Sequence, residues 1–195
     1  CWIAMVRGNH DDPAYFELQA DGNTLIHHAR WQTVPDYAVI KACGRMVLCI
    51  GGAVSVDRGI RRREMERHLG KRYYWPNETV RYDAEALDAI RDAGLQVDIV
   101  VTHTAPSICE FKSKQGLATW AQYDATLLDD CDAERSAMDK ILVHLKHDRH
   151  PLERWYYGHF HNSWHSEIDG VWFKMLDVME LLEVPRINNE KLNER

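Results

Sequence analysis

The stretch AEALDAIRDAGLQVDIVVTHTAP, residues 84–106, decides the fold class of this 195-residue chain. Its first ten residues place apolar side chains at helical spacing, and Gly94 follows as a residue that ends a helix. The next segment, VDIVV, is typical of a buried strand, and a polar turn closed by Pro106 comes directly after it. A helix, a tight turn, a buried strand and a polar loop in this order predict an α/β layered fold.

Working outward, the other segments repeat this alternation. In the first half of the chain we expect a buried strand at 1–6 ending at Gly8, a β-hairpin within 36–56 turning at Gly44 and Arg45, and an irregularity at Gly51 and Gly52. A charged helix within 57–72 follows. In the second half we expect an amphipathic helix at 132–148, a strand leading into His159, and a hairpin turning at Asp169 and Gly170. We expect one domain over 1–185 and a polar tail over 186–195.

Composition excludes several classes of protein. With 45% apolar and 28% charged residues, no run approaches the eighteen apolar residues that a membrane span needs, so no membrane partner is expected. The net charge of −6 disfavours a nuclease or another nucleic-acid-binding protein, because these usually present a basic face. Five cysteines, an odd number without a C-x-x-C pair, are typical of reduced thiols and predict a cytoplasmic location.

Polar residues of one chemical kind follow three of the expected strands. They are Asn9, His10 and Asp11 after the first strand, His103 after the second, and His159 with His161 after the third. Parallel strands bring their C-terminal loops to one edge of a sheet, so we expect these side chains to converge there. Neutral imidazoles and an amide oxygen suit a borderline divalent ion such as Mn, Fe, Zn, Ni or Co.

In order along the chain, GNHD (8–11), VVTHTAP (100–106) and YYGHFHN (156–162) resemble the second half of the signature of the calcineurin-like metallophosphoesterase superfamily. The resemblance spans Arg7 to His161 and implies a four-layer αββα sandwich, in which the final hairpin belongs to the second sheet. It implies a phosphatase or phosphodiesterase that acts on a phosphate ester, and Arg7 before the first motif favours its phosphatase branch.

Carried over position by position, the resemblance implies that Asn9, His103 and His159 bind one divalent metal ion and that His161 binds a second. Two such ions clamp phosphoryl oxygens and activate a water for in-line attack. His10 would lie beyond the metals and either protonate the leaving alcohol or stabilise charge on the phosphate. Asp11 would hold His10 or a neighbouring ligand in its tautomer.

Two arginines are candidates for binding the substrate. Arg7 precedes the first motif, and Arg58 begins the basic run DRGIRRRE. A basic side chain near the metal ligands would favour an anionic ester, although a charge run is more often a solvated helix face.

One departure from the family pattern concerns the start of the chain. The signature begins with Asp-x-His and Gly-Asp-x-x-Asp, and CWIAMVR, residues 1–7, contains neither an acid nor a histidine. We expect that the sandwich lacks its N-terminal strand and helix because the sequence is most of a longer enzyme. The alternative is a short variant that acts as a non-catalytic scaffold or interaction module. The first interpretation is favoured, because a protein seldom begins inside its own central sheet.

Overall fold

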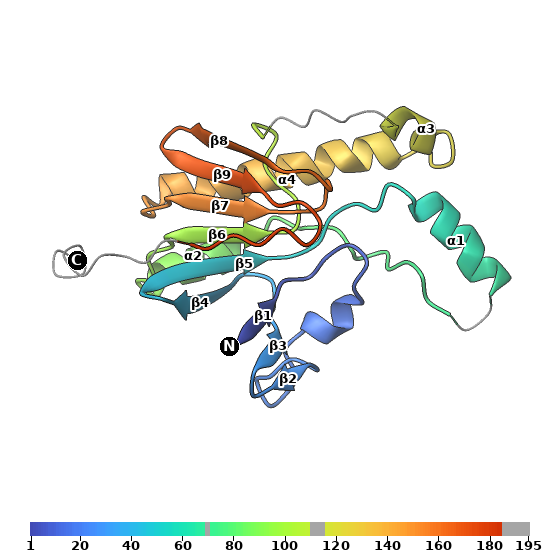
Figure 1. Cartoon of the computed structure of the whole chain (residues 1–195). Helices are drawn as coiled ribbons and strands as arrows, with labels where there is room; N and C mark the ends of the chain where they lie inside the picture. The colour runs from blue at the N-terminus through green and yellow to red at the C-terminus, as the bar shows by residue number, and fades with distance from the viewer. Residues whose placement is uncertain (69–70, 110–115, 185–195) are drawn as a thin grey trace.

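Three parallel strands, β5 (Arg45–Ile50), β6 (Ile99–Thr102) and β7 (Arg154–Tyr157), lie side by side in a six-stranded sheet, the large sheet (Figure 1). The computed structural model describes residues 1–68, 71–109 and 116–184. Because the three strands run the same way, their C-terminal ends meet at one edge of the sheet. This mixed arrangement of helices around a largely parallel sheet confirms the predicted α/β class.

The outer strands of the large sheet are antiparallel to their neighbours. β4 (Ala38–Ala42) pairs with β5, and β8 (Trp164–Ile168) pairs with β9 (Val171–Met175). Asp169 and Gly170 turn the second hairpin as predicted, both with positive φ, as a two-residue hairpin turn requires. The expectation that this hairpin lies in a second sheet is wrong, because β9 pairs in parallel with β7 and extends the same sheet.

A second, three-stranded sheet, the small sheet, contains the start of the chain. Its order is β1 (Ile3–Met5), β3 (Trp31–Thr33) and β2 (His27–His28), with β1 parallel to β3. The first strand is therefore only partly buried, and Ile3 is 55% exposed. The prediction of a buried strand at 1–6 fails there because β1 does not enter the large sheet.

Helices cover one face of the large sheet and the small sheet packs against the other. Leu48 and Ile50 of β5 point into a core shared with α2 (Ala84–Asp92) and α4 (Leu127–His147). Val47 and Cys49 point the opposite way, toward Val34 and the segment around β1. Alternation along a strand puts neighbouring residues on opposite faces, so β5 is buried on both.

The helices begin and end for local reasons. α2 starts after Asp83, whose carboxylate accepts a hydrogen bond from the backbone N–H of Ala86, and it is followed by Gly94 with a φ of 70°. α4 begins at Leu127 and not at 132 as predicted, since acidic residues in its first turn suit the positive end of the helix dipole. The other helices are α1 (Arg58–Arg67), α3 (Leu117–Ala121) and the short 3-10 helix η1 (Pro13–Phe16).

Two further expectations concern the surroundings of the domain. The polar tail expected over 186–195 lies outside the described residues. Among the helices in the described part of the chain, none has the length and apolar character needed to cross a membrane.

Candidate functional site

A cleft of about 1520 Å³ opens at the edge of the large sheet where β5, β6 and β7 end. The sequence-predicted residues that line it are Asn9, His10, Asp11, His103, His159 and His161. The turn after β1 reaches this edge although β1 belongs to the small sheet. A backbone hydrogen bond of 2.8 Å from Gly52 N–H to the Arg7 carbonyl ties this turn to the loop after β5.

Asn9 and His103 meet in the floor of the cleft. The Oδ1 atom of Asn9 lies 2.9 Å from Nε2 of His103. Two ligand atoms at about 2.1 Å from one ion, at right angles to each other, would lie about 3.0 Å apart. The His159 ring is close by, with its centroid 5.0 Å from that of His103. At 2.9 Å the imidazole N–H of His103 donates a hydrogen bond to the Asn9 amide oxygen, and the His159 ring packs edge-on against the same imidazole.

Both imidazoles are partly buried, and this burial governs their protonation state. Burial lowers the pKa of His103 to about 4 and that of His159 to about 3, because a charged ring loses hydration there. Neighbouring imidazoles add to the effect, and the carboxylate of Asp11 opposes it at His103. Near pH 7 both rings are neutral, so each offers a nitrogen lone pair to a cation.

The turn after β7 holds an unusual backbone conformation. His159 and His161 have φ values of 70° and 48°, in the left-handed region that side chains other than glycine seldom adopt. Such conformations cost on the order of 1–3 kcal/mol each and persist where the surroundings impose them. Here Gly158 N–H donates to the His103 carbonyl at 3.1 Å, which fastens the turn to the end of β6.

His10 is exposed at the cleft and lies against a cation. The Nη2 atom of Arg61 is 2.6 Å from Nε2 of His10, and the Arg61 Nε atom pairs with Asp57 at 2.8 Å. Burial and then the charge of Arg61 lower the pKa of His10, and the carboxylates of Asp57 and Asp11 act in the opposite direction. The other ring nitrogen, Nδ1, also lies against Nη2 of Arg61, so both nitrogens of His10 face this guanidinium.

Asp11 shapes the turn that carries Asn9 and His10. Its Oδ2 atom accepts a hydrogen bond of 2.7 Å from the backbone N–H of Gly8. The predicted role was to hold an imidazole in its tautomer. The structure instead gives the carboxylate a backbone partner, since the tight turn brings the Gly8 N–H within its reach.

Arg7 and Arg58 point into the protein, which corrects their predicted role in substrate binding. The Arg7 guanidinium donates to the Glu78 carbonyl at 2.7 Å and pairs with Asp36 at 2.9 Å. Arg58 is buried against two carboxylates and pairs with Asp124 at 2.6 Å. Their positive charges are balanced inside the fold, so neither is free to meet an anion in the cleft.

Two residues that sequence reasoning missed lie behind Asn9. Ser55 accepts a hydrogen bond of 2.8 Å from the Asn9 amide, and its own N–H and hydroxyl both donate to Glu78. Ser55 follows the end of β5, so a search of every strand end would have included it. Glu78 belongs to the aromatic loop YYWPNE, where nothing in the spacing marks it as part of a site.

The loop after β5 approaches this group closely because it begins with two glycines. Gly52 has a φ of 89°, and a Cβ atom there would lie 2.4 Å from the Glu78 carbonyl oxygen. The irregularity predicted at Gly51 and Gly52 is thus the point where two loops touch backbone to backbone.

Glu134 of α4 joins two of the loops that line the cleft. Its carboxylate accepts a hydrogen bond of 2.8 Å from the Thr104 hydroxyl and another from the backbone N–H of Val54. Burial raises the pKa of Glu134 to about 7, above the ordinary value of 4.5. The loops after β5 and β6 therefore depend on one buried carboxyl group.

This burial predicts how stability varies with pH. A carboxyl group whose pKa is raised on folding contributes stability that is fully present below pH 4.5 and is lost as the pH rises through about 7. Across that window the unfolding free energy should fall by on the order of 3 kcal/mol from this group. Glu134→Gln keeps both hydrogen-bonding positions but does not titrate. Urea unfolding at pH 5 and pH 8 should show a smaller loss in the variant; equal losses in both proteins would contradict the assignment.

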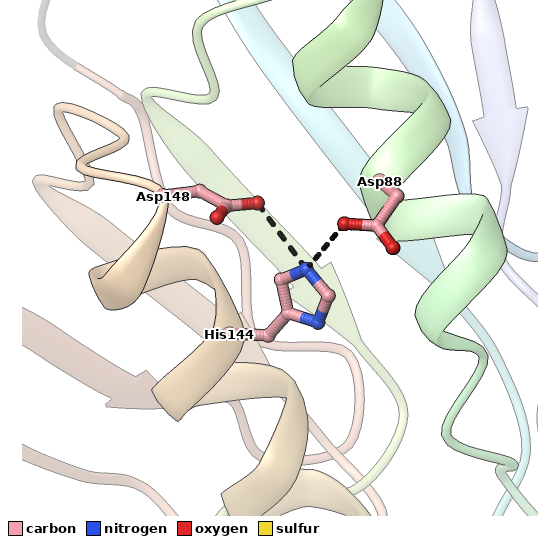
Figure 2. Close-up of side chains that lie close together, drawn as sticks. All are labelled: Asp88, His144 and Asp148. Carbon is pink, nitrogen blue, oxygen red and sulfur yellow. Dashed lines mark ion pairs between the residues drawn. The ribbon is translucent and has the colours of Figure 1, made fainter.

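A separate group of Asp88, His144 and Asp148 lies between α2 and α4 (Figure 2). Nε2 of His144 is 3.4 Å from an Asp88 oxygen and 3.2 Å from an Asp148 oxygen. The guanidinium of Arg91 pairs with both carboxylates as well, so a cation of the protein already balances them. We interpret this group as an ion-pair network that fastens the two helices together.

Comparison with known proteins adds no relative to these observations. No protein-family model matches the sequence, and no curated protein matches it. The candidate site therefore rests on the ordered motifs and on the geometry of the cleft.

Proposed function

We propose that this protein is a metal-dependent phosphoesterase of the calcineurin-like type. The observation that carries the proposal is the meeting of Asn9, His103 and His159, in which two neutral rings pack against each other and an amide oxygen lies 2.9 Å from Nε2 of His103. The small sheet on one face of the large sheet, with helices on the other face, corresponds to three of the four layers of the αββα sandwich.

The residues present match the ligands that this family implies for one of its two ions, whereas the Asp-x-His and Gly-Asp-x-x-Asp motifs are absent from residues 1–7. Asn9, His103 and His159 would hold one divalent ion of the Mn, Fe, Zn, Ni or Co group, and His161 would contribute to a second. When bound, such a pair supplies Lewis acidity and an activated water for attack on phosphorus. The His161 ring lies near enough to His10, His103 and His159 to affect the pKa of each.

His10 is placed to serve the leaving group of the substrate. Its ring is exposed in the cleft, whereas those of His103 and His159 are partly buried. There its protonated form would give a proton to the ester oxygen that departs and return to the neutral imidazole. Arg61 beside it is paired with Asp57, so this part of the cleft carries one guanidinium and one carboxylate next to the ring.

A metal-dependence assay tests the proposal directly. The full-length gene product, stripped by a chelator and then supplied with Mn²⁺, should hydrolyse p-nitrophenyl phosphate, its bis-ester, or both. The ratio of the two rates separates a phosphatase from a phosphodiesterase. If isothermal titration detects no Mn²⁺ binding and both esters stay intact, the enzyme proposal fails and the scaffold interpretation takes its place.

A further inference from the structure

We infer that Glu78 is a positioning residue, which acts through Ser55 to hold the amide oxygen of Asn9 toward His103 and the candidate metal position. The inference rests on the proposed function in taking Asn9 as a metal ligand. It adds a residue that touches neither substrate nor metal but decides which atom of the amide faces the ion.

The contacts form a continuous chain from the interior to the cleft. Glu78 and Ser55 are fully buried, each at 0% exposure, and Asn9 is 5% exposed. Glu78 Oε1 accepts from the Ser55 backbone N–H at 2.7 Å, and Oε2 accepts from the Ser55 hydroxyl at 2.8 Å. Ser55 Oγ then accepts from Asn9 Nδ2 at 2.8 Å. Because these three side chains are shielded from bulk solvent, the direction of each hydrogen bond restricts the direction of the next one.

The direction of these hydrogen bonds follows from counting protons. A serine hydroxyl has one proton, and an ionised carboxylate can only accept, so the Ser55 proton is committed to Glu78. Ser55 Oγ therefore offers only lone pairs to Asn9, and only the NH₂ end of the amide can face it. The amide oxygen must then point the other way, where it lies 2.9 Å from Nε2 of His103.

The surroundings of Glu78 contain groups that favour its charged form. Burial raises the pKa of Glu78, while the hydrogen bonds from Ser55 and the charges of Arg61 and Arg58 act against that rise. The backbone of Glu78 is held independently of the side chain, because its carbonyl accepts from Arg7 at 2.7 Å and from the Ala53 N–H at 3.2 Å. A change at the carboxylate can thus alter the hydrogen bonds from Glu78 through Ser55 to Asn9, which we call the relay, while the backbone contacts of the loop are kept.

Glu78→Gln is the sharpest change, since it preserves shape and reverses one hydrogen bond. The oxygen of the introduced amide would still accept from the Ser55 N–H, so its NH₂ group would face the Ser55 hydroxyl. That hydroxyl would then donate to Asn9 and would favour the amide with its oxygen turned away from His103. We expect the dissociation constant for Mn²⁺ to rise by roughly 10- to 100-fold, the range found when the support of a metal ligand is lost.

A second substitution, at Asn9, should restore Mn²⁺ binding when it is combined with Glu78→Gln and not when it is made alone. Asn9→Asp has an oxygen on both sides, so in the double variant it can accept from Ser55 and still present an oxygen to the metal. With Glu78 intact, the Ser55 hydroxyl donates its proton to Glu78, so the carboxylate of the introduced aspartate would face the Ser55 oxygen without a hydrogen bond between them. We therefore expect Asn9→Asp/Glu78→Gln to bind Mn²⁺ about 10-fold or more tighter than Glu78→Gln alone.

Isothermal titration of the full-length protein with Mn²⁺ alone, combined with thermal unfolding, tests the inference. Glu153→Gln is the matched control, because it removes a carboxylate just before β7, at the end of that strand away from the cleft, and should leave Mn²⁺ affinity unchanged. Unchanged affinity in Glu78→Gln, or a double variant no better than the single one, would overturn the positioning role. A wild-type protein that binds no Mn²⁺ would instead overturn the proposed function.

If the variants at Glu78 do not fold, Ser55→Ala tests whether Asn9 depends on this hydrogen-bonded support. It removes the hydroxyl that connects the carboxylate to Asn9 and leaves the backbone N–H of residue 55 paired with Glu78. We expect folded Ser55→Ala to bind Mn²⁺ about 10-fold more weakly than wild type. Wild-type affinity in this variant would show that Asn9 needs no support from the relay.

Discussion

Replacing His159 with alanine should lower the affinity of the full-length protein for Mn²⁺ by at least about 100-fold, more than loss of a supporting partner would. The ring is one of two partly buried neutral imidazoles whose centroids lie 5.0 Å apart, and alanine offers no donor atom in its place. Ester hydrolysis should fall with it, to about one thousandth or less of the wild-type rate, because activation of water depends on the ion.

Titration calorimetry and metal analysis after gel filtration measure this effect. His147→Ala is a suitable control, because that side chain is 83% exposed on the far part of α4 and lies outside the cleft. The control should keep wild-type affinity and activity. If His159→Ala retains bound manganese in stoichiometric amount, His159 is not a ligand and the metal centre has been assigned to the wrong residues.

His10→Ala should separate the chemical step from metal binding. We expect turnover to fall by about 10²- to 10⁴-fold, the usual contribution of a positioned proton donor, while the Mn²⁺ dissociation constant stays within about twofold. The reason is geometric, since His10 lies at the exposed side of the cleft against Arg61, whereas the amide of Asn9 and the ring of His103 meet below it.

The leaving group provides a sharper measurement for the same variant. A nitrophenyl ester departs readily without protonation, so its hydrolysis should suffer less from His10→Ala than that of an alkyl phosphate. His27→Ala, an exposed histidine in the small sheet, serves as the control and should behave as wild type with both esters. Equal losses for the two esters, or loss of manganese from His10→Ala, would contradict the assignment of His10 as the proton donor.

Local patterns in the sequence predicted where helices and strands occur better than they predicted which strands pair with each other. The helix at 84–93 and the strand that follows it are as expected, since helical spacing, a glycine and an apolar run are all local signals. The sheet to which β1 and β9 belong was not predictable, because pairing depends on residues far away in the chain. Periodicity shows which face of a strand is buried but not which strand lies beside it.

The same distinction applies to the site. Asn9, His103 and His159 were expected to converge because each follows a predicted strand, and the structure places all three in one cleft. Glu78 was not found, since its part depends on Ser55, which is 23 residues away and buried with it. The role of Arg58 was misjudged for a related reason: its partner Asp124 is 66 residues away, and nothing in a basic run reveals a buried ion pair.

The left-handed backbone at His159 and His161 has a consequence for the thermodynamics of ion capture. Because hydrogen bonds between loops fix this turn in the free protein, little chain entropy remains to be lost when the rings acquire a ligand. In such a preorganised turn, the positions of the histidine side chains would not adapt to the size or preferred geometry of each cation. Preference among transition metals would then follow the intrinsic order of their affinities for nitrogen donors and their supply in the cell, more than any adjustment by the protein.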